Sequence, residues 1–349
     1  MNSVNGLKKS SAKALPSLSV VFSFRNEETV LRELIARTRT VLQGERTKGH
    51  LSSYELIFVN DASTDRSLEI LCNEAKGHND IRVITMSRCF GVSPCVLAGM
   101  EYTCGDAVVY MYADLQDPPE LIPELLHAWQ SDEHMEVVHT VRLSRKGEPG
   151  LKLLITRIGY HILNKFAMIY LPVEAGDFKL LSRRAVDYLV QLKENQPFVR
   201  GLVCWIGFKQ GYVQYHRQPR HAGRSKFHVL SLKVINNFFG SALISFSSAP
   251  LKIASCFGLL AIFVDFIIGG VALLQMIQGK ALPGWTALMI VILFLGGVQL
   301  FCLGIMGLYL NSVYEQSKNR PNYIVDHIFG FSEDTLRKMR RNHEYPVRC

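Results

Sequence analysis

The residues with the clearest chemical potential lie between Tyr112 and Glu120, which read YADLQDPPE. They follow a short apolar run, 107–111, that predicts a buried strand of a parallel sheet. Asp114 and Asp117 are therefore expected at the carboxyl end of a strand, where open α/β sheets bind their ligands. Carboxylates in that position predict a site for a divalent cation and a diphosphate.

The surrounding sequence alternates apolar strands with amphipathic helices. Expected strands cover 18–24, 54–60, 81–87 and 107–111, and expected helices cover 30–44, 66–77 and 91–105. Strands that alternate with helices of this length form βαβ units around a parallel sheet. A second acidic cluster, 61–65, directly follows the strand at 54–60. The pattern predicts that acidic side chains from two strand ends converge on one face of the sheet.

The composition limits the possible partners. The chain has 349 residues, a net charge of +9 and a pI of about 9.1, which suits anionic lipid headgroups or phosphorylated substrates. It has no run of Lys and Arg with interleaved aromatic residues, so we expect no nucleic-acid partner. None of the eight cysteines forms a Cys-x-x-Cys pair, which argues against a zinc site or a disulfide framework and for a reducing compartment.

Two long apolar segments near the C-terminus predict a membrane hairpin. The segment 253–277 is apolar except for Asp265 and Gln275. The segment 285–310 has no charge, and each exceeds the roughly 20 residues that a spanning helix needs. Most Lys and Arg lie outside the short connection, so the positive-inside rule places both ends in the cytoplasm. A buried hairpin in a soluble protein is the alternative, and Asp265 would face a partner helix, be protonated or lie near a lipid.

Two basic segments precede this hairpin. Apolar residues at helical spacing across 151–169, with Lys and Arg beside them, predict either a core helix or an interfacial helix on an anionic membrane. The loop 215–227 contains Arg217, Arg220, Arg224 and Lys226. Arg suits bidentate phosphate binding and Lys acts as a point charge. The loop lies just before the membrane segment, where a lipid headgroup would arrive, and a solvated basic loop is the alternative.

Several motifs, taken in order, resemble those of family 2 glycosyltransferases. They are Asn26-Glu27-Glu28, Asp61 to Asp65, Ala113 to Glu120, Gly176-Asp177-Phe178, Arg200-Gly201 with Trp205 to Phe208, and Ala222 to Lys226. Together with the hairpin and the tail KNRPNYIV, they resemble the polyisoprenyl-phosphate glycosyltransferases. That subgroup includes bactoprenol glucosyltransferases, the undecaprenyl-phosphate aminoarabinose transferase and dolichyl-phosphate mannose synthases. The resemblance covers about residues 18 to 328.

The resemblance implies an α/β GT-A fold, a Rossmann-like, mostly parallel sheet followed by a two-helix transmembrane hairpin. It implies a hexosyltransferase of the inner membrane, facing the cytoplasm, that moves one sugar from a nucleotide-sugar to undecaprenyl or polyprenyl phosphate with inversion. The lipid-phospho-sugar would serve cell-envelope glycan modification, for example of lipopolysaccharide. UDP-glucose is the first expected donor, while UDP-N-acetylglucosamine, other UDP-hexoses and GDP-mannose remain open. Relatives also imply a homo-oligomer, a tetramer.

The resemblance assigns roles to individual residues. Mg²⁺ or Mn²⁺ would be held by Asp114 and the carbonyl of Gln116, the donor by Ser23, Arg25, Glu27, Asp61, Tyr112, Ala113 and Asp114, and the acceptor phosphate by Arg217, Arg220, Arg224, Ser225 and Lys226. Asp114 and Asp177 are the expected catalytic residues. Asp177 matches a proposed base, but for an ionised phosphate nucleophile we expect orientation or a minor base role. The alternative for Asp61, Glu27, Asp65 and Asp117 is helix capping.

The chain departs from the family pattern at Tyr112, where an Asp is usual. Cys89 replaces a usual Asn, Leu308 a usual Glu, and Asn60 a frequent Asp. Since a phenol is a poor ligand for Mg²⁺, a catalytically degenerate membrane scaffold of the same fold stays open. A processive polysaccharide synthase is a further alternative, but it needs a Gln-x-x-Arg-Trp segment and many spans, and this sequence has neither.

The sequence thus divides into five expected parts. They are a flexible basic arm at 1–16, a catalytic domain at 17–230, an interfacial helix at 231–252, a transmembrane hairpin at 253–312 with spans at about 253–277 and 286–310, and a cytoplasmic tail at 313–349.

Overall fold

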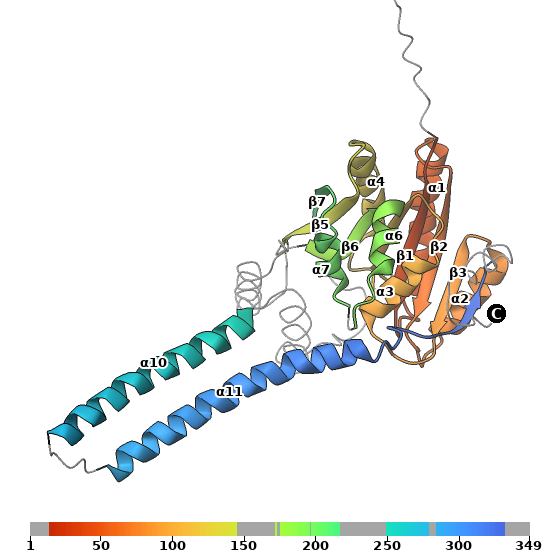
Figure 1. Ribbon diagram of the computed structural model, residues 1–349. Helices are drawn as coiled ribbons and strands as arrows, with labels where there is room; N and C mark the ends of the chain where they lie inside the picture. Colours follow the sequence, from red (N-terminus) through yellow and green to blue (C-terminus); the bar gives the residue numbers. More distant parts are fainter. Residues whose placement is uncertain are drawn as a thin grey trace, which may run out of the picture.

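The computed structural model describes residues 14–144, 172, 175–195, 197–216, 249–278 and 284–331. Its elements are β1 (Ser17–Phe24), α1 (Leu31–Thr47), β2 (Ser53–Asn60), α2 (Ser67–Gly77), β3 (Ile81–Met86), α3 (Val92–Glu101), β4 (Ala107–Tyr112), η1 (Pro119–Leu121), α4 (Ile122–Gln130), β5 (Val137–Ser144), β6 (Ala175–Ser182), α6 (Arg183–Gln191), α7 (Val199–Trp205), β7 (Gln210–His216), α10 (Ala249–Ile277), α11 (Trp285–Ser317) and β8 (Val325–Phe329). Figure 1 shows their arrangement.

One eight-stranded sheet forms the centre, in the order β7-β5-β6-β4-β1-β2-β3-β8. The strands β1 to β4 are mutually parallel, and β5 is parallel to β7. Only β6 and β8, among the strands that the structure describes, run against their neighbours. The expected strands and helices of the first 112 residues are present. The predicted fold class, a mostly parallel Rossmann-like sheet flanked by helices, is therefore confirmed.

Both faces of the sheet are covered by helices, which accounts for the apolar strands. Val20 and Phe22 of β1 pack with residues of α1 and α4 on one face, whereas Val21 packs with α3, α6 and α7 on the other. Phe22 also stacks on Phe58 of β2, with ring centroids 4.7 Å apart. Central parallel strands are buried on both sides in this way, and most of their buried side chains are apolar.

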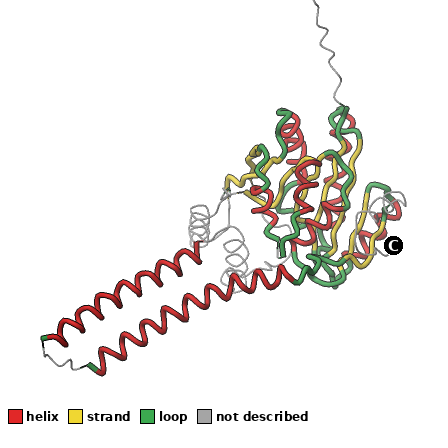
Figure 2. The backbone as a smooth tube through the Cα atoms, in the orientation of Figure 1, coloured by secondary structure: helices red, strands yellow, loops and turns green. Residues whose placement is uncertain are grey.

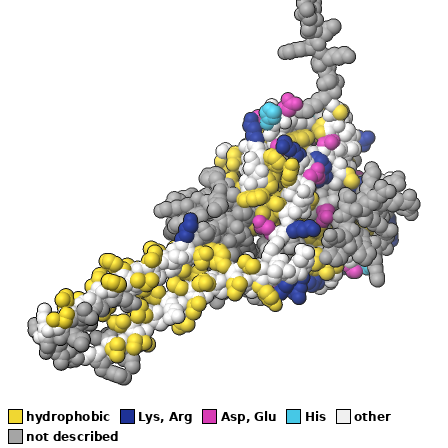
Figure 3. Space-filling model, viewed as in Figure 1, with side chains coloured by type: hydrophobic (Ala, Val, Ile, Leu, Met, Phe, Trp, Pro, Cys, Tyr) yellow, Lys and Arg dark blue, Asp and Glu magenta, His cyan; other side chains and the backbone are white. Residues whose placement is uncertain are grey.

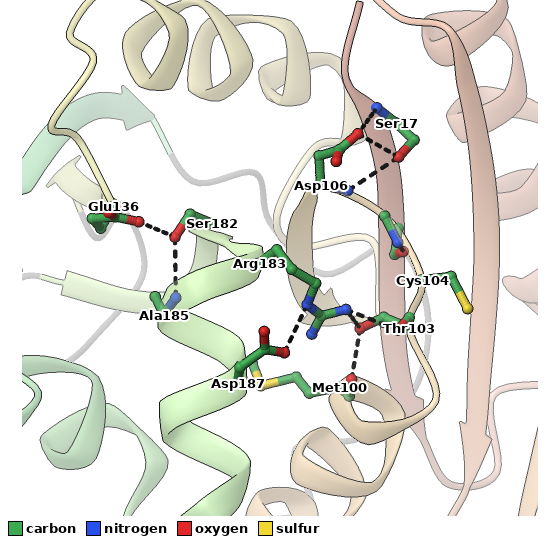
Figure 4. Close-up of polar contacts among 12 residues, drawn as sticks. Ser17, Met100, Thr103, Cys104, Asp106, Glu136, Ser182, Arg183, Ala185 and Asp187 are labelled. Carbon is green, nitrogen blue, oxygen red and sulfur yellow. Dashed lines mark hydrogen bonds and ion pairs between the residues drawn. The ribbon is translucent and has the colours of Figure 1, made fainter. Parts of the chain in front are cut away.

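A polar frame holds the corner where β6 turns into α6 (Figure 4). Ser182 caps α6, because its Oγ accepts a hydrogen bond from the amide of Ala185 at 3.1 Å. Arg183 then donates to the carbonyl oxygen of Thr103 at 2.8 Å, across to the segment that leads into β4. Loss of such a cap typically costs about 1 kcal/mol. The frame fixes β6 beside β4, and β6 carries Asp177.

The helices α10 and α11 extend from the domain as an antiparallel pair (Figures 1 and 2). The windows Pro250–Ile268 and Val291–Ser317 are long and apolar enough to cross a membrane. Their side chains are exposed, for example Phe266 at 83% and Leu293 at 72%, and hydrophobic atoms cover the pair in Figure 3. An apolar surface of this extent marks a membrane or partner contact. A buried soluble hairpin does not fit these exposures.

The sheet is attached to α11 at two points. Gln316, near the end of α11, accepts a hydrogen bond from the amide of Asn195 at 2.8 Å. Seven residues after the helix ends, β8 pairs with the edge strand β3, and the amide of Ser87 donates to the carbonyl of Ile324 at 3.0 Å. The sequence analysis did not predict β8, since it treated 313–349 as a tail.

Several predicted features lie outside the described residues. They are most of the basic arm (1–13), the helical segment 151–169, the acceptor-phosphate residues Arg217, Arg220, Arg224, Ser225 and Lys226, the part of the interfacial helix before Ala249, and residues 332–349.

We predict that Gly330→Ala weakens the docking of β8. Gly330 has φ +80°, and an added Cβ would lie 2.3 Å from the carbonyl oxygen of Ile81. The left-handed backbone alone costs a residue with a Cβ about 1–2 kcal/mol. Hydrogen exchange of the amides in β8 should accelerate by roughly fivefold or more. Gly77→Ala is the control, because nothing lies within 4 Å of its added Cβ. Unchanged exchange in Gly330→Ala would contradict the prediction.

Candidate active site

Three turns at the carboxyl ends of neighbouring parallel strands carry most of the predicted site. The turns after β1, β2 and β4 contain Asn26, Ala62 and Leu115, with φ of 55°, 51° and 55°. A left-handed conformation costs a non-glycine residue about 1–2 kcal/mol, and such strain collects at functional sites. The fold therefore holds three turns in fixed shapes at the sheet edge where ligands bind.

Asp61, at the end of β2, is a buried carboxylate that faces the start of α3. Its oxygens accept hydrogen bonds from the amides of Phe90 at 2.7 Å and Gly91 at 3.1 Å, and from the thiol of Cys89 at 3.2 Å. Asp61 thus ties the end of β2 to the turn before α3. These partners differ from the cap of α2 that was the alternative for this residue.

Asp65 links the start of α2 to the turn after β1. Its carboxylate accepts from the amide of Ser67, the first residue of α2, at 3.0 Å and from the amide of Glu28 at 3.2 Å. The amide of Glu27 donates to the Oγ of Ser67 at 2.9 Å. These bonds lock the turn after β1 against the start of α2, which places the Glu27 segment beside Asp61.

Two further residues that were predicted to contact the nucleotide-sugar donor lie at the same edge of the sheet. Ser23 is buried at the end of β1, and its hydroxyl has no hydrogen-bond partner among the described residues. Buried hydroxyls are usually paired, so this one is available to a ligand. Arg25 is exposed, and its guanidinium donates to the sulfur of Cys89 at 2.7 Å. Their roles in nucleotide binding remain predictions.

Asp114 lies directly after β4 and is 8% exposed. Its Oδ1 accepts from the amide of Gln116 at 3.2 Å, and the preceding Ala113 is buried. Mg²⁺ and Mn²⁺ prefer hard oxygen ligands, and Mg²⁺ is often bound by one or two protein carboxylates together with substrate phosphates. The carboxylate of Asp114 fits that requirement.

Asp117, the second acid of the motif, is fully buried and takes part in a polar network. Its carboxylate accepts a hydrogen bond from the phenol of Tyr215 on β7, and it pairs with Arg142 of β5 at 3.5 Å. Arg142 also donates to the Tyr215 oxygen at 3.1 Å. Asp117 therefore joins the turn after β4 to the other end of the sheet.

Tyr112 does not act as a replacement for the carboxylate usual at its position. Its phenol donates a hydrogen bond to Oδ2 of Asp177 at 2.6 Å. Burial and the nearby charge of Asp177 raise the pKa of Tyr112 well above its usual value, so the phenol stays protonated. A protonated phenol engaged in this way is no ligand for a hard cation.

Asp177 of β6 forms an ion pair with Arg200 of α7. The guanidinium Nε donates to Oδ1 at 3.0 Å, and its terminal nitrogen pairs with Oδ2, a bidentate and charge-assisted arrangement. Burial by itself would raise the pKa of Asp177, but the charge and hydrogen bonds of Arg200 dominate and hold this pKa well below its usual range. Asp177 is therefore a persistent carboxylate with both oxygens engaged.

A cavity of about 200 Å³ opens beside this pair. Tyr110, Tyr112, Asp177 and Arg200 line it, together with residues at the start of α3 and Phe198 and Val199 before and in α7. A charged pair at the wall of a cavity next to the β4 edge is a suitable place for an anionic group. Tyr112, Asp177 and Arg200 thus come together in the structure, whereas Asp114 lies two residues further along the chain from Tyr112 and does not line this cavity.

Sequence reasoning missed two buried basic residues behind Asp177. Lys179 is fully buried on β6, and burial lowers its pKa to about 8. Its Nζ has no hydrogen-bond partner among the described residues. His139 is opposite it on β5, and burial together with the charge of Lys179 lowers the pKa of His139 to about 3, so the imidazole is neutral. Neither residue belongs to a recognisable motif, and only the strand pairing brings them together.

Comparisons with known proteins identify the family of this chain. Residues 19–190 match the family model described as glycosyl transferase family 2. An uncharacterized glycosyltransferase of Bacillus subtilis (strain 168), YkcC, is 39% identical over 91% of this chain and 96% of its own. A prophage bactoprenol glucosyl transferase homolog of Escherichia coli (strain K12) is 33% identical over 89% and 99%. The solved mannosyltransferase PcManGT from Pyrobaculum calidifontis, in complex with GDP-Man and Mn²⁺, covers 87% of each chain at 15% identity and a TM-score of 0.45.

We predict that Asp177→Asn destabilises the protein by about 1–3 kcal/mol at pH 7, because Arg200 loses a charge-assisted partner. The lowered pKa of Asp177 means that its contribution is complete above the unfolded value near about 3.9 and is lost as the pH falls through the lower folded value. The stability gap between the variant and the wild type should therefore shrink below about pH 4.

Denaturant unfolding in detergent at pH 7 and at acidic pH measures this gap. Asp132→Asn is the control, since Asp132 is paired with Lys209 at the surface, where ion pairs contribute little. If the difference in unfolding free energy between Asp177→Asn and the wild type stays constant with pH, the ion pair with Arg200 does not set the pKa of Asp177.

Proposed function

The chain belongs to glycosyl transferase family 2. From that premise, we propose that it transfers one sugar from a nucleotide-sugar to the phosphate of undecaprenyl or another polyprenyl phosphate. UDP-glucose is the first expected donor. It is a glycosyltransferase that uses a lipid carrier. Its fold combines a mostly parallel sheet, whose carboxyl edge is where nucleotides bind in such sheets, with two exposed apolar helices. The observation that carries the proposal is the attachment of the catalytic domain to the apolar helix α11, through the pairing of β8 with β3 and the hydrogen bond from Asn195 to Gln316.

The donor is assigned to the turns after β1, β2 and β4. Asp114, and the carbonyl of Gln116, would hold a divalent cation, Mg²⁺ or Mn²⁺, that neutralises the charge developing on the nucleotide diphosphate as it leaves. Ser23, whose buried hydroxyl lacks a partner among the described residues, and Asp61 lie along the same edge, where the nucleoside is expected. Tyr112 contacts Asp177, so the cation is assigned to Asp114 without it.

The acceptor is assigned to the side of Asp177 and Arg200. A phosphate monoester is already ionised at neutral pH, so it needs placement and charge compensation more than a strong base. Asp177 orients the guanidinium of Arg200 at the cavity wall, and its low pKa makes it a weak proton acceptor. Arg217, Arg220, Arg224, Ser225 and Lys226, outside the described residues, are proposed to complete the phosphate site.

The reaction is a single displacement. A phosphate oxygen of the lipid forms a bond to the anomeric carbon while the bond from that carbon to the diphosphate breaks. Attack from the opposite face inverts the configuration, so an α-linked donor gives a β-linked lipid-phospho-sugar. No proton needs to leave the ionised nucleophile, which agrees with an orienting role for Asp177.

The membrane assignment follows from the same architecture. We place α10 and α11 across the inner membrane with the catalytic domain on the cytoplasmic side, where nucleotide-sugars are made. The product would supply cell-envelope glycan modification, and the assembly would be a homo-oligomer, a tetramer. The exposed apolar surface of both helices supports contact with lipid and with neighbouring copies.

We expect the detergent-purified full chain to convert undecaprenyl phosphate and UDP-glucose into a lipid-phospho-hexose when Mg²⁺ or Mn²⁺ is present, and not in EDTA. Mass spectrometry of the lipid fraction, with UDP-N-acetylglucosamine and GDP-mannose tested in parallel, identifies the donor. A product with another sugar would correct the donor alone. No product and no nucleotide binding by the folded protein would overturn the proposed function and favour a scaffold role.

We predict that Asp114→Asn lowers kcat/KM by at least about 100-fold, the size typical of one lost electrostatic contact to a transition state. Tyr112→Phe should stay within about tenfold of the wild type, since it removes one hydrogen bond to the Asp177 carboxylate and no ligand of the cation. Initial rates over a Mn²⁺ titration give the comparison. If Tyr112→Phe raises the half-saturating Mn²⁺ concentration as much as Asp114→Asn does, then Tyr112 contributes to the cation site and its assignment here is wrong.

A further inference from the structure

We propose that Glu45, His50 and His127 form a binding site for a transition-metal ion of the zinc type, at the end of the domain opposite the catalytic edge. Glu45 lies in the last turn of α1, His50 follows that helix, and His127 lies in the last turn of α4. These ends precede β2 and β5, whereas Asp114 follows β4. In Figure 1 they lie at the end of the domain far from α10 and α11.

The three ligand atoms are already close together. Oε2 of Glu45 lies 2.7 Å from Nδ1 of His50 and 3.8 Å from Nε2 of His127. All three atoms lie within 4.8 Å of one another. Zinc bonds of about 2.0–2.1 Å in tetrahedral geometry place ligand atoms roughly 3.3 Å apart. The observed separations lie on both sides of this value, so small side-chain rotations are enough to seat an ion.

The backbone that carries these side chains is fixed. The amide of His50 donates to the carbonyl of Glu45 at 3.0 Å, across the left-handed Gly49. The carbonyl of His50 accepts from Nε2 of Gln130, the last residue of α4, at 3.3 Å. His127 lies one turn earlier on that helix. The backbone of His50 is therefore tied to both α1 and α4, the helix that carries His127.

The electrostatic setting favours a cation. Two helix C-termini, those of α1 and α4, meet here, and each carries a partial negative charge. Glu45 adds a carboxylate that is only 2% exposed. Lys48 contacts the other oxygen, Oε1, at 2.8 Å, and its own side chain is mostly exposed, so it can move into solvent when an ion binds. Oε2 is the oxygen that faces both histidines.

The ligand atoms of this cluster favour a different kind of metal ion from the one that the ligand atoms at the catalytic edge favour. Two imidazoles and one carboxylate suit Zn²⁺ and similar borderline ions, whereas the carboxylate and carbonyl oxygens near Asp114 suit Mg²⁺ or Mn²⁺. Both histidines are partly exposed, which leaves a fourth position open to water. The cysteine spacing, which argued against zinc, says nothing about this cluster, because only the fold brings His127 to Glu45 and His50.

An ion at this site would connect α1 and α4, two of the helices that cover one face of the sheet. Arg37 of α1 already pairs with Glu120, just before α4, at 2.8 Å. Because an ion that binds only the folded state adds to its stability, Zn²⁺ should raise the unfolding temperature of the whole domain. The site is thus a structural or regulatory one, separate from sugar transfer.

The test is a calorimetric titration of ZnCl₂ into the full chain in detergent, without a histidine tag and after treatment with EDTA. We expect a site of one Zn²⁺ per chain that is weakened at least tenfold in His50→Gln and in His127→Gln. His78→Gln is the matched control, because His78 is a partly exposed histidine that contacts a glutamate, Glu74, at 3.9 Å. It should bind Zn²⁺ as the wild type does.

The unfolding temperature provides the second readout. Zn²⁺ should raise it in the wild type and in His78→Gln, but not in the His50→Gln/His127→Gln double variant, whose folding is checked by circular dichroism. Asp114→Asn should keep its response to Zn²⁺, so failure of the catalytic assignment leaves this test intact. Absence of Zn²⁺ binding, or equal affinity in the double variant, would falsify the proposed metal site.

Discussion

Burial of the central strands on both faces is the constraint on which the rest of this structure depends. Val20, Val21 and Phe22 of β1 have no access to solvent, and β2 and β4 are buried in the same way. Polar ligands can therefore gather only where the strands end. The strained turns at Ala62 and Leu115 are the local cost of turning the chain there while the carboxylates of Asp61 and Asp114 remain at the edge.

The same constraint explains why the charged groups at the edge are so strongly coupled. A carboxylate as enclosed as Asp177 is stable only with a counter-charge, and Arg200 provides it with two parallel hydrogen bonds. Tyr112 then uses its phenol on the same carboxylate. The tyrosine at position 112 therefore contacts Asp177, the partner of Arg200, and does not act beside Asp114 as a second carboxylate would.

Much of the fold could be predicted because the first four strands are apolar runs separated by amphipathic helices, and the motif residue Asp114 directly follows the fourth. The later strands could not. β6 reads AGDFKLLS, which places two charged residues among the apolar ones, and β8 is a five-residue edge strand, VDHIF, with only Ile328 buried in the core. Lys179 and His139 were missed for a related reason: their burial arises from strand pairing between distant segments, and no local pattern records it.

The continuous path from α11 into β8 has a consequence for how substrate is found. An α-helix of 33 residues is about 50 Å long, which exceeds the hydrocarbon thickness of about 30 Å, so its last turns can hold the sheet edge at a set height above a bilayer. A domain held at one height and in one orientation samples a thin layer of headgroups. Under the proposed function, its encounter with a lipid phosphate is then a two-dimensional search whose rate would follow the surface density of the carrier lipid, whereas the nucleotide-sugar would arrive by diffusion through the surrounding solution.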